Sequence, residues 1–92
     1  MPAIPMKSVA RPEFWRLFEA LPVELQERAR ACFELWRTNP GHPSLRFKKV
    51  GDCWSIRIGL HYRALAVLRD DVAIWFWIGP HDEYERLLHT KV

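Results

Sequence analysis

A chain of 92 residues is long enough for one domain, and we expect residues 1–92 to form a single domain. No apolar run approaches the roughly 18 residues of a membrane span, and the proline-broken N-terminus lacks a signal peptide's apolar centre, which predicts a cytoplasmic protein that avoids membranes. Two cysteines are too few for a disulfide framework, and a net charge of +3 permits an anionic partner without requiring one.

The first half of the chain predicts two helices. Residues 1–10 have no clear period and are expected to be irregular or to add one edge strand. Pro12 suits the first turn of a helix, where its missing N–H is not needed. Apolar residues then recur at helical spacing, at Phe14, Leu17, Phe18 and Leu21. Pro22 begins a second amphipathic helix, which Asn39-Pro40 ends because a residue before proline avoids the α region. The two helices predict a hairpin.

After Asn39 the apolar period changes from 3.6 to 2, which indicates strands. They are expected at residues 45–50, 54–58, 62–68 and 72–78. The connections between them are short, so neighbouring strands should be antiparallel, and the helix hairpin is the available cover for their apolar face. The expected fold class is α+β, with an N-terminal helix hairpin packed on a four-stranded antiparallel twisted sheet and a short C-terminal helix.

The last strand delivers ionisable side chains to the start of that C-terminal helix. His81 and Tyr84 lie one turn apart just beyond a Gly-Pro break. A neutral imidazole can accept a proton, and a tyrosine hydroxyl can donate or accept one. The alternative is purely structural, with Asp82 and Glu83 stabilising the helix start and Tyr84 packing on the sheet.

Basic residues follow the polar face of the predicted sheet. Arg57 and Arg63 should lie close together across a hairpin that turns near Gly59, with Lys48 and Lys49 on the strand before. Such a surface can hold a phosphate backbone, with arginine directed at developing negative charge. It can equally be a solvated face whose charges pair with nearby aspartates.

The remaining candidate functional residues are two tryptophans and the potential metal ligands. Alternation places Trp75 and Trp77 on the same face of their strand, where they could stack on RNA bases or pack in a core or protein interface. The four histidines and two cysteines show no metal-ligand spacing, so no metal site is expected.

Several segments in this order resemble the RelE/ParE superfamily of small bacterial toxins. The resemblance covers roughly residues 12–88 and is carried by the helix hairpin, NPGHPSLRFKKV, WSIRI, YRAL and WFWIGPHDEYERLL. It implies a type II toxin that a co-expressed acidic antitoxin holds inactive. In the RelE-like and HigB-like branches, the toxin cuts mRNA in the ribosomal A site without a metal or other cofactor. The RNA 2′-hydroxyl attacks the adjacent phosphate, and the protein supplies a base, an acid and cations.

Carried over to this chain, the resemblance implies four catalytic residues and a set that grips RNA or the ribosome. The catalytic set is Arg57, Arg63, His81 and Tyr84. The binding set is Arg46, Lys48, Lys49, Trp75 and Trp77. Ser55 departs from the pattern, because this position is often Lys or Arg in the ribonuclease members. The alternatives are a ParE-like toxin that poisons DNA gyrase and an inactive member that only binds proteins.

Overall fold

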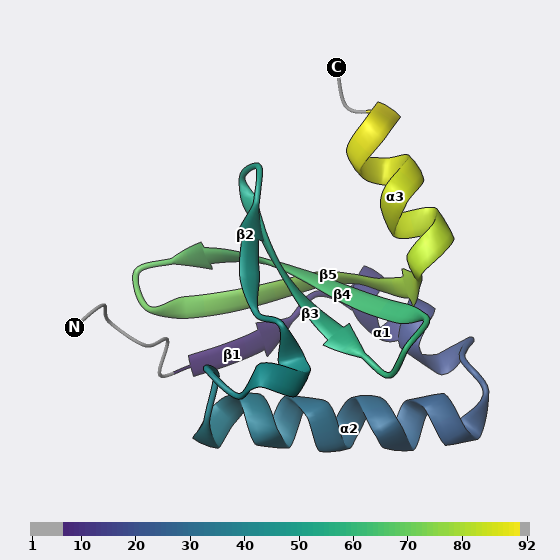
Figure 1. The fold of residues 1–92 in the computed structure, drawn as a ribbon, viewed down its shortest axis with the longest axis horizontal. Helices are drawn as coiled ribbons and strands as arrows, with labels where there is room; N and C mark the ends of the chain where they lie inside the picture. The colour runs from purple at the N-terminus through teal and green to yellow at the C-terminus, as the bar shows by residue number, and fades with distance from the viewer. Residues whose placement is uncertain (1–6, 91–92) are drawn as a thin grey trace.

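The computed structural model describes residues 7–90, which form a five-stranded sheet with three α-helices (Figure 1). In chain order the elements are β1 (Lys7–Ala10), α1 (Pro12–Glu19), α2 (Val23–Thr38), the 3-10 turn η1 (Pro43–Leu45), β2 (Lys48–Val50), β3 (Cys53–Ile58), β4 (Tyr62–Arg69), β5 (Val72–Pro80) and α3 (His81–Thr90). None of the helices within residues 7–90 has the length and apolar character needed to cross a membrane.

The sheet has the strand order β1-β5-β4-β3-β2. Strands β2 to β5 form the predicted antiparallel meander. β1 is the edge strand that the sequence left open for residues 1–10, and it brings the four expected strands to five; its pairing parallel to β5 was not predicted. At its end Arg11 N–H donates to the Trp75 carbonyl at 2.9 Å. In the sequence, the helix hairpin and three strands lie between β1 and its partner β5. Local periodicity does not reveal a pairing between segments so far apart.

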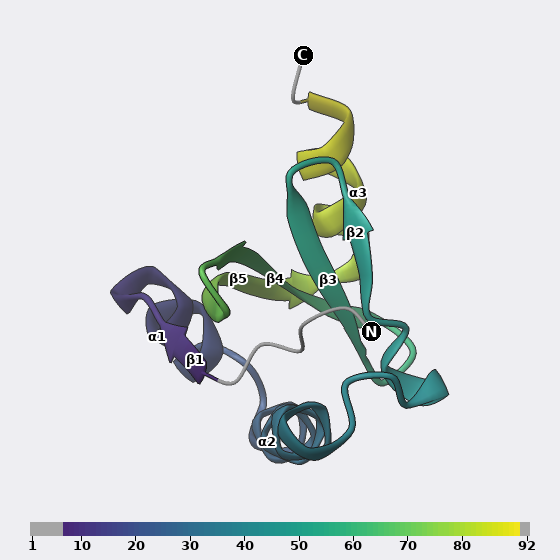
Figure 2. The same ribbon diagram turned by 90° about the vertical axis from the view of Figure 1, so that its left-hand side faces the viewer.

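The helix hairpin covers one face of the sheet. Helix α1 begins at Pro12 as predicted and buries Phe14 and Phe18, while α2 buries Ala29 and Trp36. These residues share a core with Ile56, Ala64, Trp75 and other side chains of the sheet. Helix α2 runs along this face, whereas α3 and the β2–β3 hairpin project on the other side (Figures 1 and 2). The face opposite α2 is called the outer face below.

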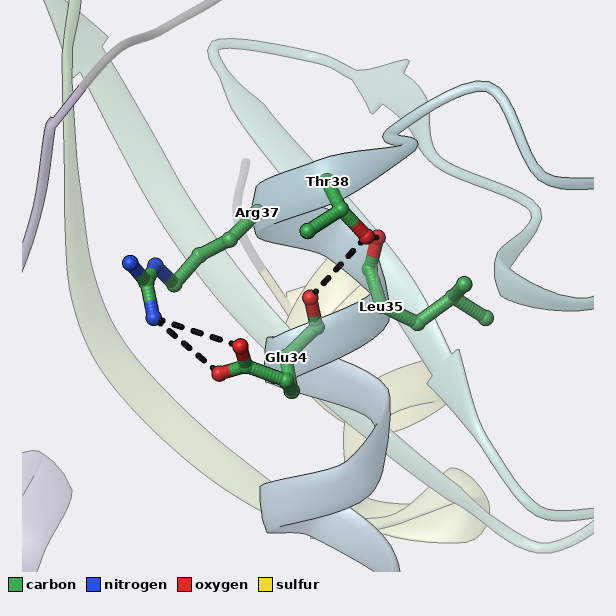
Figure 3. A network of polar contacts seen from close by, with 4 residues as sticks. All are labelled: Glu34, Leu35, Arg37 and Thr38. Carbon is green, nitrogen blue, oxygen red and sulfur yellow. Dashed lines mark hydrogen bonds and ion pairs between the residues drawn. The ribbon is translucent and has the colours of Figure 1, made fainter.

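Helix α2 ends at Thr38, where the Asn39-Pro40 signal predicts its end. Thr38 Oγ1 donates to the Leu35 carbonyl at 3.1 Å, and an exposed ion pair joins Arg37 to Glu34 at 3.0 Å (Figure 3). An exposed i,i+3 pair contributes little stability. The helix is therefore ended mainly by the proline-restricted backbone rather than by this polar network.

The predicted strand at residues 45–50 is shorter than expected. Pro43–Leu45 forms a 3-10 turn, Leu45 is buried, and Arg46 adopts a left-handed backbone with φ of 47°. Pairing begins only at Lys48. The prediction of a strand from Leu45 is wrong because the proline and the left-handed residue turn the chain before it joins the sheet.

A bulge in β5 separates the two tryptophans. Trp75 pairs with Ala66 and Trp77 with Leu65, so the intervening Phe76 has no partner in β4. Ala66 and Leu65 are consecutive and point to opposite faces of the sheet. The prediction that Trp75 and Trp77 share a face is therefore wrong, because one extra residue in β5 reverses the alternation.

Candidate functional site

A cavity of about 270 Å³ lies on the outer face, between the β2–β3 hairpin and α3. We call it the outer-face cavity. Its polar lining comes from five elements or their connections and consists of Arg46, Lys48, Ser55, Arg63, His81, Tyr84 and Glu85. Val50 and Leu88 complete it. Residues far apart in the sequence thus meet in one hollow.

Strand register explains which sheet residues reach this cavity. Ile56 and Ala64 are opposite each other and belong to the helix-side core. Their neighbours Ser55 and Arg63 must therefore point to the outer face. Lys48 lies opposite Ser55 in β2 and points the same way. The outer-face cavity is a direct consequence of β-strand alternation.

Arg63 is held at the centre of the site. Its Nη1 donates to the Tyr62 carbonyl at 2.8 Å, and its Cζ lies 6.0 Å from the centroid of the Tyr84 ring. Burial lowers the pKa of the Arg63 guanidinium below its ordinary value, and the nearby charge of Arg57 lowers it further. A partly desolvated guanidinium is weakly screened, which strengthens its attraction for an anion.

The start of α3 supplies the other ionisable groups. His81 N–H donates to the His61 carbonyl at 2.6 Å, which ties the first residue of α3 to the β3–β4 turn. Its Nε2 lies 3.4 Å from Glu85 Oε1, and its ring centroid lies 5.6 Å from that of Tyr84. Tyr84 is buried, with 5% of its surface exposed. The imidazole and the phenol therefore lie next to each other at the cavity wall.

The remaining predicted site residues lie outside the cavity. Arg57 is opposite Arg63, but its Nε donates to the Gly59 carbonyl at 3.0 Å and it does not line the cavity. Lys49 pairs with Trp54 and, by alternation, points away from the outer face. Trp77 lines a separate hollow with Glu83 and Arg86.

Trp75 is excluded from base stacking by its burial. Only 2% of its surface is exposed, its ring packs edge-on against Phe33 and Trp36 of α2, and its Nε1 donates to Ser8 Oγ at 2.8 Å. The prediction that Trp75 binds RNA is therefore wrong, because the strand alternation places this side chain in the core.

Two cavity residues, Glu85 and Ser55, were missed as site residues. Glu85 follows His81 by four residues, a helical spacing that could have identified it as a partner. Ser55 gave no signal as a lining residue, because a small polar side chain between apolar neighbours is typical of any half-buried strand.

The electrostatics of the outer-face cavity favour an anionic ligand. Arg46, Lys48 and Arg63 bring three positive charges to its lining, against one carboxylate from Glu85. Arginine and lysine side chains form strong, charge-assisted hydrogen bonds with phosphate oxygens. The site therefore combines cations with a possible proton acceptor and donor in His81 and Tyr84.

Comparisons with known proteins agree with this architecture. The model of the ParE-like toxin domain matches residues 23–86. No curated protein sequence matches the chain. Similar solved structures include toxins and toxin–antitoxin complexes, with sequence identities that support a shared fold only.

Three such structures show the extent of the likeness. The RelB–RelE antitoxin–toxin complex from Methanococcus jannaschii has a TM-score of 0.68 at 16% identity, covering 86% of this chain and 96% of that one. YafQ from E. coli has a TM-score of 0.65 at 8% identity, covering 85% and 96%. The isolated E. coli RelE toxin has a TM-score of 0.63 at 13% identity, covering 89% and 98%. With the family model spanning most of its length, the chain belongs to the ParE-like toxin domain family of the RelE/ParE superfamily.

Proposed function

We propose that this protein is the toxin of a type II toxin–antitoxin module and acts in the cytoplasm as a metal-independent, ribosome-dependent mRNA endoribonuclease. The observation that carries the proposal is the outer-face cavity, where His81 and Tyr84 meet the Arg63 guanidinium. A proton acceptor, a proton donor and a desolvated cation are what intramolecular RNA cleavage requires.

The proposed reaction is attack by an RNA 2′-oxygen on the adjacent phosphorus. A base removes the 2′-hydroxyl proton, the bond from phosphorus to the 5′-oxygen breaks, and an acid protonates that oxygen. The products are a 2′,3′-cyclic phosphate and a free 5′-hydroxyl. His81 and Tyr84 carry the protons, and Glu85 beside Nε2 leaves Nδ1 of His81 to accept one. Arg63 stabilises the additional negative charge on the phosphate oxygens.

Gyrase inhibition is the second candidate, and the description of the matching family as ParE-like favours it. Such a toxin needs a docking surface and no catalytic residues. Induced expression followed by separate measurement of protein synthesis and plasmid supercoiling distinguishes the two. Immediate arrest of translation with unchanged supercoiling supports the ribonuclease. Loss of supercoiling before any translation defect overturns it in favour of gyrase inhibition.

The expected partner is a small acidic antitoxin encoded next to the toxin. The similar structures from Methanococcus jannaschii and E. coli include toxin–antitoxin complexes, and the cavity cations here suit acidic side chains. Affinity should weaken as salt is raised, because part of the attraction is electrostatic. Calorimetric titration at low and high salt measures this, and equal affinities would exclude a charged interface.

A further inference from the structure

Ser55 is the one buried polar residue of the described core, with 2% of its surface exposed. It nevertheless lines the outer-face cavity. No hydrogen bond joins its hydroxyl to another side chain or backbone group that the structure describes. Among the described residues the one fully enclosed side-chain polar atom without a partner is Trp36 Nε1, so the Ser55 hydroxyl keeps access to the cavity and can donate to a ligand there.

The neighbours of Ser55 determine the kind of ligand. Lys48 lies directly opposite it in β2, and Leu65 lies opposite it in β4. Arg46 and Arg63 line the same cavity. A hydroxyl donor among three cations suits an anionic oxygen and repels a metal cation.

We propose that the Ser55 Oγ–H donates a hydrogen bond to a non-bridging oxygen of the scissile phosphate and is a fourth catalytic contact beside Arg63, His81 and Tyr84. This inference rests on the proposed ribonuclease function. Ser55 acts as a donor and not as a nucleophile, since activating a serine requires a base bonded to its hydroxyl and no described residue is so placed. The Ser55 hydroxyl is neutral, whereas ribonuclease members of the superfamily often have Lys or Arg at this position. The charge of the phosphate would therefore be neutralised by the other cavity cations, Arg46, Lys48 and Arg63.

The first test compares Ser55→Ala with Ser55→Thr in single-turnover cleavage of ribosome-bound mRNA. Losing a hydrogen bond to a charged group should slow Ser55→Ala by roughly 10- to 100-fold. Ser55→Thr keeps the hydroxyl and should cut faster than Ser55→Ala. Ser44→Ala is the matched control, because Ser44 is an exposed serine outside the cavity lining whose hydroxyl is hydrogen-bonded to His42. It should cut at the parent rate.

Stability separates a catalytic from a structural role. The hydroxyl has no partner in the described chain, so Ser55→Ala should have a Tm equal to or above that of the parent. A structural serine would instead lower the Tm when removed. A Ser55→Ala variant that is both less stable and slower, and that responds to sulfur in the substrate as the parent does, would contradict the proposal.

A sulfur substitution in the substrate tests the contact itself. Sulfur is a poor hydrogen-bond acceptor, so one phosphorothioate diastereomer at the cleavage position should slow the parent about tenfold more than it slows Ser55→Ala. Equal slowing of the two proteins by both diastereomers, or equal cleavage rates on normal RNA, would overturn this inference alone. A parent that never cuts ribosome-bound mRNA would overturn the proposed function, and this inference with it.

Discussion

Arg57 and Arg63 lie directly opposite each other on β3 and β4, yet only Arg63 lines the outer-face cavity. The Arg57 guanidinium is bonded to the Gly59 carbonyl at 3.0 Å, beside the β3–β4 turn. We expect Arg63→Ala to slow mRNA cleavage about a hundredfold or more, because one preorganised donor is lost. Arg57→Ala should slow it less than about tenfold, since the residue acts through long-range charge.

Single-turnover rates on stalled ribosomes measure this difference, with circular dichroism to confirm that both variants are folded. Equal losses in the two variants would mean that Arg57 leaves the Gly59 carbonyl and contacts RNA directly.

His81→Ala should reduce cleavage by roughly 10²–10⁴-fold if the imidazole transfers a proton. Glu85→Gln keeps a similar shape but removes the carboxylate beside His81 Nε2. It should give a smaller loss, because Glu85 positions the ring without touching the reacting atoms. Asp82→Asn, an exposed change in the same helical turn, is the control and should cut at the parent rate. A folded His81→Ala variant with parent activity would remove this residue from the site.

Tyr84 is expected to serve both stability and chemistry. Tyr84→Phe keeps the buried ring and should leave the urea midpoint nearly unchanged, while slowing cleavage about a hundredfold if the hydroxyl carries a proton. Tyr84→Ala removes the ring under Arg63 and should lower the free energy of unfolding by about 3 kcal/mol. Urea unfolding beside cleavage rates separates the two effects. A Tyr84→Phe variant with parent activity would limit the residue to packing.

The two tryptophans should differ in stability effect. Trp75→Ala leaves a cavity between the sheet and α2 and should lower the free energy of unfolding by about 3–5 kcal/mol. Trp77→Ala removes a less buried ring on the outer face and should be milder. Chemical denaturation of both variants measures the difference. Equal losses would contradict the bulge at Phe76, because without it both rings would lie on one face.

Cys32 predicts a pH dependence of stability. Burial raises the pKa of its thiol above the ordinary value of 9.0, although a backbone hydrogen bond from Gly59 and the charge of Arg28 oppose the shift. Above that value the unfolded chain loses the thiol proton while the folded protein retains it. The free energy of unfolding should therefore fall as the pH rises past about 9, and more steeply in the parent than in Cys32→Ala. Denaturation series at alkaline pH test this, and identical slopes would contradict it.

Sequence reasoning was most successful where local physics decides the structure. The end of α2 at Thr38 follows from Asn39-Pro40, and the antiparallel meander follows from short turns between alternating segments. Alternation also placed Arg63 on a polar face, and the break after Ile78 placed His81 near a helix start. These features depend on residues only a few positions apart.

Failures arose where distant or irregular backbone decides. The parallel pairing of Lys7–Ala10 with β5 depends on a partner more than sixty residues away. The bulge at Phe76 reversed the face of Trp77, and the left-handed Arg46 shortened β2. Pro43 marks the turn before β2, but no Gly or Pro marks the bulge at Phe76, so a strict period of 2 misplaces Trp77. Ser55 was overlooked as a lining residue because its significance depends on the helix that covers it from beyond β5.

The most direct test of the account is primer-extension mapping of mRNA on stalled ribosomes, with the parent protein and a folded Arg63→Ala variant side by side. We predict new 5′ ends within the A-site codon for the parent, absent when ribosomes are omitted and reduced about a hundredfold or more for Arg63→Ala. Intact mRNA after incubation with the folded parent, or equal cutting by the two proteins, would contradict the assignment of RNA cleavage to the outer-face cavity.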